Sequence, residues 1–126
     1  MTGDVRSLVV FQRAYALSLA VHRASLKWPK VEQVGGIASQ VRRSSKAVCA
    51  LLAEGSGRQH ASEREWGRYV VMALGSADET KLWCSYAEDL GYAETGEAEA
   101  WRRECGEIAR MLQGLLQRRK RLQTGD

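Results

Sequence analysis

Hydrophobic positions recur with helical spacing through almost the whole chain. In the segment 8–27 they follow a four-three-four-three-four spacing from Val10 to Trp28, which places them on one face of a helix. Three further segments, at about 36–54, 62–90 and 95–122, keep the same period. No segment alternates apolar and polar residues between two turns, so no strand is expected.

The breaks between these segments carry residues that end or start helices. Gly55 and Gly57 predict the end of the second helix, because glycine suits the position just after a helix. Ser62 and Glu65 have the S-x-x-E spacing of a capping box and predict the start of the third helix. Gly91 predicts its C-terminal cap. Short connections of this kind favour antiparallel neighbours.

The sequence therefore predicts an all-α fold, an antiparallel up-down-up-down four-helix bundle in a single domain over residues 1–126. A chain of 126 residues with 44% hydrophobic content is long enough for one core. No window reaches about 18 apolar residues, so no membrane contact is expected. The first residues lack the layout of a signal peptide. Cys49, Cys84 and Cys105 form no C-x-x-C pair, which favours buried thiols in a reducing cytoplasm.

The third helix is apolar on more than one face. Its inward row includes Ala73 and Ala77, whose small side chains let a neighbouring helix approach closely. Trp83, Tyr86 and Leu90 form a second apolar row on an adjacent face. A helix that is apolar on two faces usually has two packing partners, so we expect a homo-oligomer.

Glu79 lies near the apolar stripe of the same helix. A buried carboxylate costs several kcal/mol unless it is hydrogen-bonded or paired. One hypothesis is that Glu79 contacts Gln40 or Arg43 of the second helix. The alternative is that Glu79 is exposed to solvent.

Basic residues supply the remaining functional signal. The net charge is +4, and residues 1–60 are basic whereas residues 61–126 are slightly acidic. Binding to a polyphosphate requires cations gathered on one surface. The residues expected to bind nucleic acid are Arg42, Arg43, Lys46, Arg58, Arg64, Arg68, Arg118, Arg119, Lys120 and Arg121. The alternative is that these arginines serve subunit or partner contacts, because several have glutamates as neighbours.

No pattern of catalytic or metal-binding residues emerges. His22 and His60 are the only histidines, and neither has a carboxylate three residues earlier or a second ligand at metal-binding spacing. Gly55 and Gly57 are not followed by the Lys-Ser/Thr pair of a phosphate-binding loop, and no Gly-x-Ser-x-Gly elbow occurs. We therefore expect no metal, no cofactor and no enzymatic activity.

Five groups of residues resemble one known family. They are Phe11-Gln12-Arg13-Ala14; Gln40-Val41-Arg42-Arg43-Ser44; Ala53-Glu54-Gly55-Ser56-Gly57-Arg58 with Ser62, Glu65 and Arg68-Tyr69; Ala73-Leu74-Gly75-Ser76 with Glu79; and Leu90-Gly91-Tyr92. In this order they resemble the four-helix bundle proteins encoded in intervening sequences of bacterial 23S ribosomal RNA genes. The accessory variability determinant proteins of diversity-generating retroelements are relatives of that family.

The resemblance implies a cytosolic four-helix bundle that assembles as a homopentamer and has no catalytic residues. In the retroelement relatives, the assembly binds nucleic acid and a reverse transcriptase through a basic surface. The family often has Pro-Ala-Asn where this chain has Cys49-Ala50-Leu51, so a straighter second helix is expected. Together these features predict a non-enzymatic oligomeric accessory protein that binds RNA or DNA. The alternative is a protein–protein scaffold that binds no nucleic acid.

Overall fold

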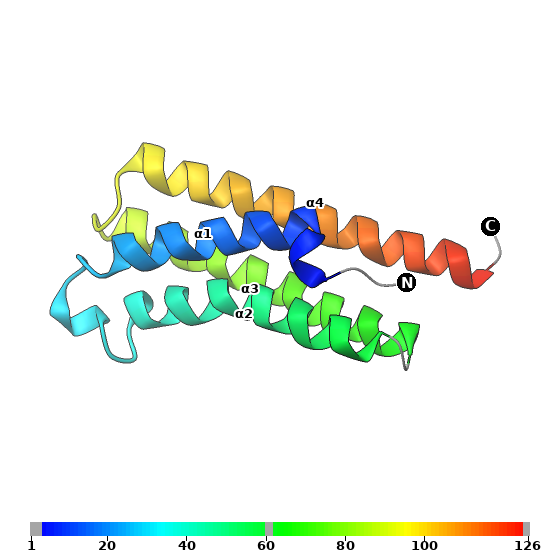
Figure 1. Cartoon of the computed structure of the whole chain (residues 1–126). Coiled ribbons are helices and arrows are strands. Elements are labelled where there is room, and N and C mark those ends of the chain that lie inside the picture. Colours follow the sequence, from blue (N-terminus) through cyan, green and yellow to red (C-terminus); the bar gives the residue numbers. More distant parts are fainter. Residues whose placement is uncertain (1–3, 60–61, 125–126) are drawn as a thin grey trace.

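The computed structural model describes residues 4–59 and 62–124, and the side chains as far as residue 120. Its four long helices are α1 (Val9–Ser25), α2 (Ile37–Arg58), α3 (Glu63–Asp89) and α4 (Thr95–Thr124). Two single-turn 3-10 helices, η1 (Val5–Ser7) and η2 (Lys30–Glu32), flank α1. The described residues contain no strand, and the predicted all-α four-helix bundle is confirmed (Figure 1).

Each helix packs against the next one along the chain, and α4 closes the bundle by packing against α1. Successive helices run in opposite directions, so the end of α2, the start of α3 and the end of α4 lie at one end of the bundle (Figure 1). This cyclic order puts the α1–α2 side opposite the α3–α4 side. Residues on these two sides are therefore on different surfaces of the molecule.

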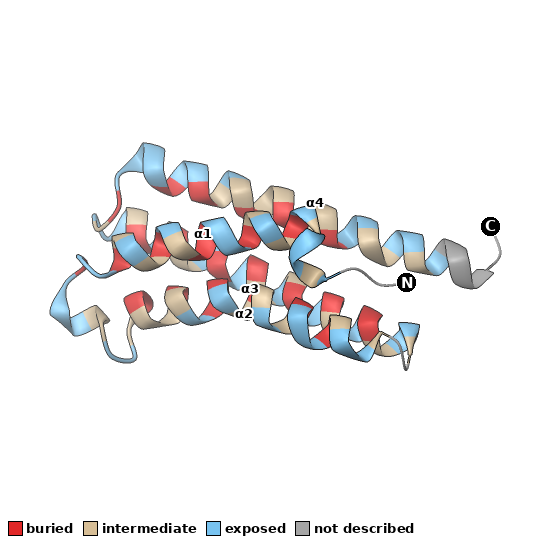
Figure 2. Cartoon of the chain, in the orientation of Figure 1, coloured by how far each residue is buried: buried red, intermediate tan, exposed pale blue. Residues whose placement is uncertain are grey.

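Helix α3 faces the core with mostly small side chains. Its buried residues are Trp66, Gly67, Val70, Ala73, Ala77, Thr80, Cys84 and Ala87. Buried residues from all four helices face the centre of the bundle (Figure 2). The hydroxyl groups of Thr80 and Ser44 lie 2.8 Å apart and form a buried hydrogen bond between α3 and α2. Small residues on α3 therefore allow close packing on both of its neighbours.

The three cysteines are free thiols. Cys84 and Cys105 are buried, and Cys49 is half-buried. Burial raises the pKa of Cys84 and of Cys105 to about 12, and that of Cys49 to about 11. All three stay protonated near neutral pH, as expected of thiols that pack in a core.

The expectation that Gly55 and Gly57 end the second helix is wrong, because α2 continues to Arg58. Gly55 is buried where α2 crosses α3. A Cβ atom at this position would lie 2.6 Å from the Cβ of Tyr69 and 3.1 Å from Cε3 of Trp66. The sequence requires glycine here for close approach to α3 and not for a positive φ angle.

The predicted start and end of α3 are confirmed. The Ser62 hydroxyl accepts a hydrogen bond from the backbone N–H of Glu65 at 3.1 Å. Only half of the capping box forms, since the Ser62 N–H donates to the Arg58 carbonyl and the Glu65 carboxylate pairs with Arg68. Gly91 follows the helix with φ at 79°, as a C-terminal cap requires.

The predicted contact of Glu79 with Gln40 or Arg43 is not made. Glu79 is exposed and accepts a hydrogen bond at 3.3 Å from Nε1 of Trp83, one turn along the same helix. In this turn of α3, the next residue, Thr80, is the one that faces the core. A shift of one residue rotates a side chain by about 100° around a helix, so the polar contact with α2 falls to Thr80.

The close approach at Gly55 gives a stability prediction. We expect Gly55→Ala to lower the free energy of unfolding by about 1–3 kcal/mol, because the added methyl group overpacks the α2–α3 contact. Gly57→Ala, with nothing within 4 Å of the added atom, should be neutral or raise it by about 0.5 kcal/mol through helix propensity. Urea unfolding measures both variants. Equal or greater stability of Gly55→Ala relative to Gly57→Ala would contradict the packing account.

Candidate nucleic-acid interface

The predicted nucleic-acid-binding residues do not gather on one surface. Arg42 and Lys46 lie on the α1–α2 side, where they contact Ser25 and His22 of α1. Arg58 lies about 24 Å farther along α2 than Arg42, at about 1.5 Å per residue. Four other cations line a groove between α3 and α4, on the opposite side of the bundle.

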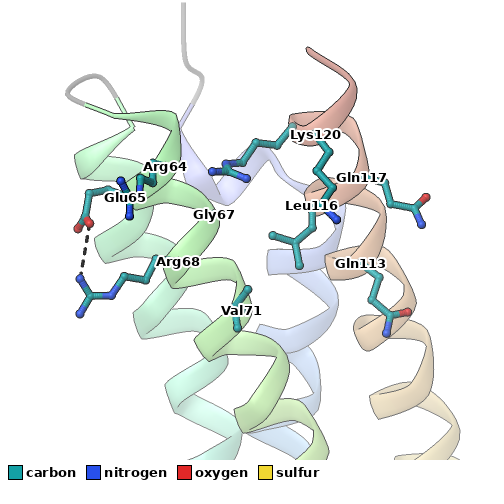
Figure 3. Close-up of a pocket in the computed structure, with 10 residues that line it drawn as sticks. Arg64, Glu65, Gly67, Arg68, Val71, Gln113, Leu116, Gln117 and Lys120 are labelled. Atoms are coloured by element: carbon teal, nitrogen blue, oxygen red, sulfur yellow. Dashed lines mark ion pairs between the residues drawn. The ribbon is translucent and has the colours of Figure 1, made fainter. Parts of the chain in front are cut away.

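This groove lies between the first turns of α3 and the last described turns of α4 (Figure 3). Its volume is about 1050 Å³. The residues that line it are Arg64, Glu65, Gly67, Arg68, Val71, Gln113, Leu116, Gln117, Arg119 and Lys120. Four cations and one carboxylate give the groove a net positive charge, and we call it the α3–α4 groove.

Arg119 reaches from α4 across the start of α3. Its Nε atom donates a hydrogen bond to the backbone carbonyl of Glu63 at 2.8 Å. Gly67 makes room for this side chain, because a Cβ atom at Gly67 would lie 2.6 Å from Nε. The guanidinium group is therefore held over the first turns of α3 by a glycine and a backbone acceptor.

The other groove residues divide into an apolar floor and a charged rim. Val71 and Leu116 point toward each other between the two helices, whereas Arg68 pairs with Glu65 on the outer side of α3 (Figure 3). That ion pair has an N–O distance of 3.6 Å and is exposed, so it contributes little to stability. Arg64 has no ion-pair partner within the described residues.

A second group of basic residues lies on the α1–α2 side. Nζ of Lys46 lies 2.9 Å from Nδ1 of His22. The guanidinium group of Arg42 donates to the Ser25 hydroxyl at 2.8 Å and to the Gln33 carbonyl at 3.4 Å. These contacts join α2 to the end of α1 and to the loop that follows it. Arg42 thus uses its donors inside the bundle.

The electrostatics of His22 reflect this basic surrounding. Burial lowers the pKa of His22 first, and the charges of Lys46, Arg42 and Arg23 lower it further. Neutral imidazole is the form that accepts a hydrogen bond from the Lys46 ammonium group. In this pair Nδ1 of His22 is therefore the acceptor and Nζ of Lys46 the donor.

The remaining predicted residues lie outside the groove. Arg43 is exposed on α2, and Arg58 pairs with Glu54 at 3.4 Å. Arg118 is exposed on α4 and does not line the groove. The side chain of Arg121 falls outside the described part of the chain.

The sequence analysis did not predict the uncharged residues of the groove, which are Gly67, Val71, Gln113, Leu116 and Gln117. The wall from α3 uses positions 64, 67, 68 and 71, and the wall from α4 uses positions 113, 116, 117 and 120. Both sets have the spacing of one helical face, so this signal is present in the sequence. That these two faces lie side by side depends on the packing of α3 against α4, which no local pattern reveals.

Neither a metal centre nor a membrane-spanning helix occurs in the described residues. None of the groups of His, Cys, Asp and Glu that they contain has the arrangement needed to hold a metal ion. His60, the second histidine of the chain, lies outside the described residues. None of the described helices has an apolar stretch that could cross a membrane.

Comparison with known proteins identifies the family of the chain. Residues 6–114 match the family described as 23S rRNA-intervening sequence protein. The chain belongs to this family. The structure is also similar to a crystal structure from Bacteroides thetaiotaomicron, described as a protein with unknown function from the S23 ribosomal protein family. The TM-score is 0.76 and the identity 18%, over 86% of this chain and 98% of the other. The sequence matches no curated protein.

The 23S rRNA-intervening sequence protein match ends before the groove does. It includes the α3 wall and Gln113, but Leu116, Arg119 and Lys120 lie beyond residue 114. The family therefore accounts for the bundle and for the α3 wall. The cations from α4 lie outside the part of the chain that the family describes.

The basic surrounding of His22 gives a pKa prediction. We expect His22 to titrate below the ordinary value of 6.5, and Lys46→Met to raise this pKa because it removes a neighbouring positive charge. Since the unfolded state binds the proton more tightly, this group makes stability rise with pH through the window below about 6.5. An NMR titration of the imidazole signals, assigned with His22→Gln, measures the pKa.

The matched control is Arg103→Met, which removes an exposed cation of α4 that pairs with Glu99. It should leave the pKa of His22 unchanged. A His22 pKa above 6.5 in the wild-type protein, or an equal pKa in Lys46→Met, would contradict the described geometry.

Proposed function

We propose that this 23S rRNA-intervening sequence protein is a non-enzymatic, oligomeric accessory protein of the cytoplasm that binds RNA or DNA. The α3–α4 groove is the binding surface. The observation that carries the proposal is the gathering of Arg64, Arg119 and Lys120 around one groove whose single carboxylate, Glu65, pairs with Arg68. Cations that share a surface release counterions from a phosphate backbone, which is the main source of such affinity.

The direction of Arg119 supports this proposal. Cations near the end of α4 are stabilised by the negative end of its helix dipole. That effect does not explain why Arg119 contacts α3. Arg119 instead lies over the first turns of α3, where the helix dipole is positive. These cations and the dipole, offset in part by Glu63 and Glu65 in the first turn of α3, give a positive potential that attracts an anion.

Several arginines outside the groove have carboxylate partners. Arg13 pairs with Glu104 at 2.6 Å, and Arg102 pairs with Glu88 at 2.7 Å. Both pairs are partly buried and link α4 to another helix. These arginines serve packing, whereas Arg64 and Lys120 lack such a partner in the described chain.

The outer face of α3 supports the oligomer. Large apolar side chains are exposed along it, among them Leu82 (50% exposed), Tyr86 (48%) and Leu90 (53%). We propose that this face is the contact between copies of the chain, in the homopentamer that the family resemblance implies. Val71 lies nearer the start of α3 than these residues and lines the groove, so the proposed subunit contact lies beside the groove and does not include Val71.

A protein–protein scaffold is the second candidate, and the same exposed apolar face favours it. A partner protein, such as the reverse transcriptase of the retroelement relatives, would cover α3 in place of a sister subunit. The two candidates differ in their response to salt. Binding through several phosphates weakens steeply as salt rises, whereas binding through apolar contacts does not.

The groove proposal predicts the effect of removing its unpaired cations. Arg64→Ala with Lys120→Ala should weaken polynucleotide binding. It should also reduce the slope of log K against log salt by about 1.4, because each phosphate of a single strand that a cation neutralises adds about 0.7 to that slope. Fluorescence anisotropy with a labelled oligonucleotide at several salt concentrations measures both quantities.

The matched control is Arg43→Ala with Lys46→Ala, which removes the same charge from α2. We expect this control to keep at least most of the affinity and the wild-type slope. The groove assignment is wrong if the α2 variant loses binding and the groove variant keeps it.

The exposed face of α3 predicts the assembly state. In light scattering, the wild-type protein should have a mass of about five chains of 14.0 kDa. Leu82→Lys with Tyr86→Lys should give single folded chains, because it places charges in an apolar contact. Leu26→Lys, at a residue that is 58% exposed outside α3, is the matched control and should keep the wild-type mass. A monomeric wild-type protein at high concentration would exclude this contact.

A further inference from the structure

The α3–α4 groove combines a cationic rim with an apolar floor, and few anionic ligands can contact both. Its cations lie around the start of α3 and the end of α4, and its floor contains the apolar side chains of Val71 and Leu116. Gln113 and Gln117 also line the groove, from α4. An inorganic phosphate ion would bind the cations and leave the apolar floor exposed to water. A ligand that fits the whole groove has both an anionic part and a flat apolar part.

Nucleic acid has this composition, but only an unpaired strand presents it. A duplex keeps its bases stacked and paired inside and offers phosphates and sugars to a protein that cannot enter its grooves. The apolar floor lies between two packed helices, where the paired and stacked bases of a duplex do not reach it. A single strand can turn one base away from its neighbours and place it on the plane of an arginine side chain and against apolar side chains.

The fixed position of Arg119 adds to this preference. Its Nε atom is bound to the Glu63 carbonyl, and its two Nη atoms have no hydrogen-bond partner among the described residues. A planar guanidinium group that is already held in place can stack on a base or donate to a phosphate with little further loss of entropy. Gly67 sets this position, because any larger residue would displace the side chain.

We propose that the α3–α4 groove binds a single-stranded segment of nucleic acid. The phosphates contact Arg64, Arg119 and Lys120, and one unstacked base lies on Val71 and Leu116. This inference rests on the proposed function and adds the class of nucleic acid. An acidic protein segment that also carries an apolar side chain would satisfy the same groups, and the test below includes it as an outcome.

The test uses the full chain and three labelled probes of one sequence, each about 12 nucleotides long, within the usual range for a single-strand site. They are an unpaired RNA, the same RNA annealed to its complement, and an abasic strand of equal charge. We expect the unpaired RNA to bind about tenfold more tightly than the other two, because a base against the floor buries apolar surface that phosphates alone do not bury.

Two sets of variants locate the preference. Val71→Ser with Leu116→Ser should weaken binding of the unpaired RNA about fivefold and leave binding of the duplex unchanged, because these substitutions remove apolar surface from the floor and change no cation. Gly67→Ala should weaken the unpaired RNA several-fold by moving Arg119, whereas Gly75→Ala, on the same helix with open space around it, should not. Circular dichroism confirms that each variant is folded.

The outcomes separate this inference from the proposed function. If the duplex binds as tightly as the unpaired RNA and the floor variant changes nothing, the single-strand inference is wrong while salt-dependent nucleic-acid binding stands. Unchanged binding by both Gly67→Ala and the floor variant places the site elsewhere and also overturns the inference. If no probe binds and an acidic peptide does, the proposed function itself fails.

Discussion

The small side chains on the inward face of α3 are the constraint on which the bundle depends. Ala73 and Ala77 allow α3 to pack closely against its neighbours, and Gly55 of α2 allows the closest approach, against Tyr69. Trp66 and Val70 are large residues of α3 that face the core, whereas other large residues, such as Leu82 and Tyr86, face outward. One helix therefore provides both the centre of the core and an apolar outer surface.

The same close packing creates the candidate site. Because α3 and α4 are antiparallel, the end of α4 lies beside the start of α3. Gly67 has no side chain, so the Arg119 side chain can lie over the first turns of α3. Cations that would otherwise extend from the end of one helix are thereby turned toward the positive end of another. The bundle tolerates this concentration of charge at its surface, and an anionic ligand would relieve it.

The sequence was sufficient to predict the number and order of the helices, because helical periodicity and caps are local signals. The prediction was wrong where the same residue type fits two different structural roles. Glycine is common at helix ends, but Gly55 lies inside α2 and allows a close contact with Tyr69. Only the position of Tyr69 distinguishes these two roles of glycine. At Glu79 and Thr80, a shift of one residue decided which side chain faces α2.

The site was predicted in part for a similar reason. Basic residues are visible in any sequence, and four of the ten predicted cations line the groove. The separation of the others, and the uncharged floor formed by Val71 and Leu116, follow from which helix faces meet. Tertiary packing determines that pairing, so no pattern within one helix contains it.

Whether the α3–α4 groove binds nucleic acid can be measured by mapping the amide signals of the full chain by NMR while unpaired RNA is added. We expect the signals of residues 64–71 and 113–120 to change together and saturate, and those around His22 and Lys46 to stay unchanged. Changes confined to the α1–α2 side, with the groove signals unaffected, would contradict this expectation.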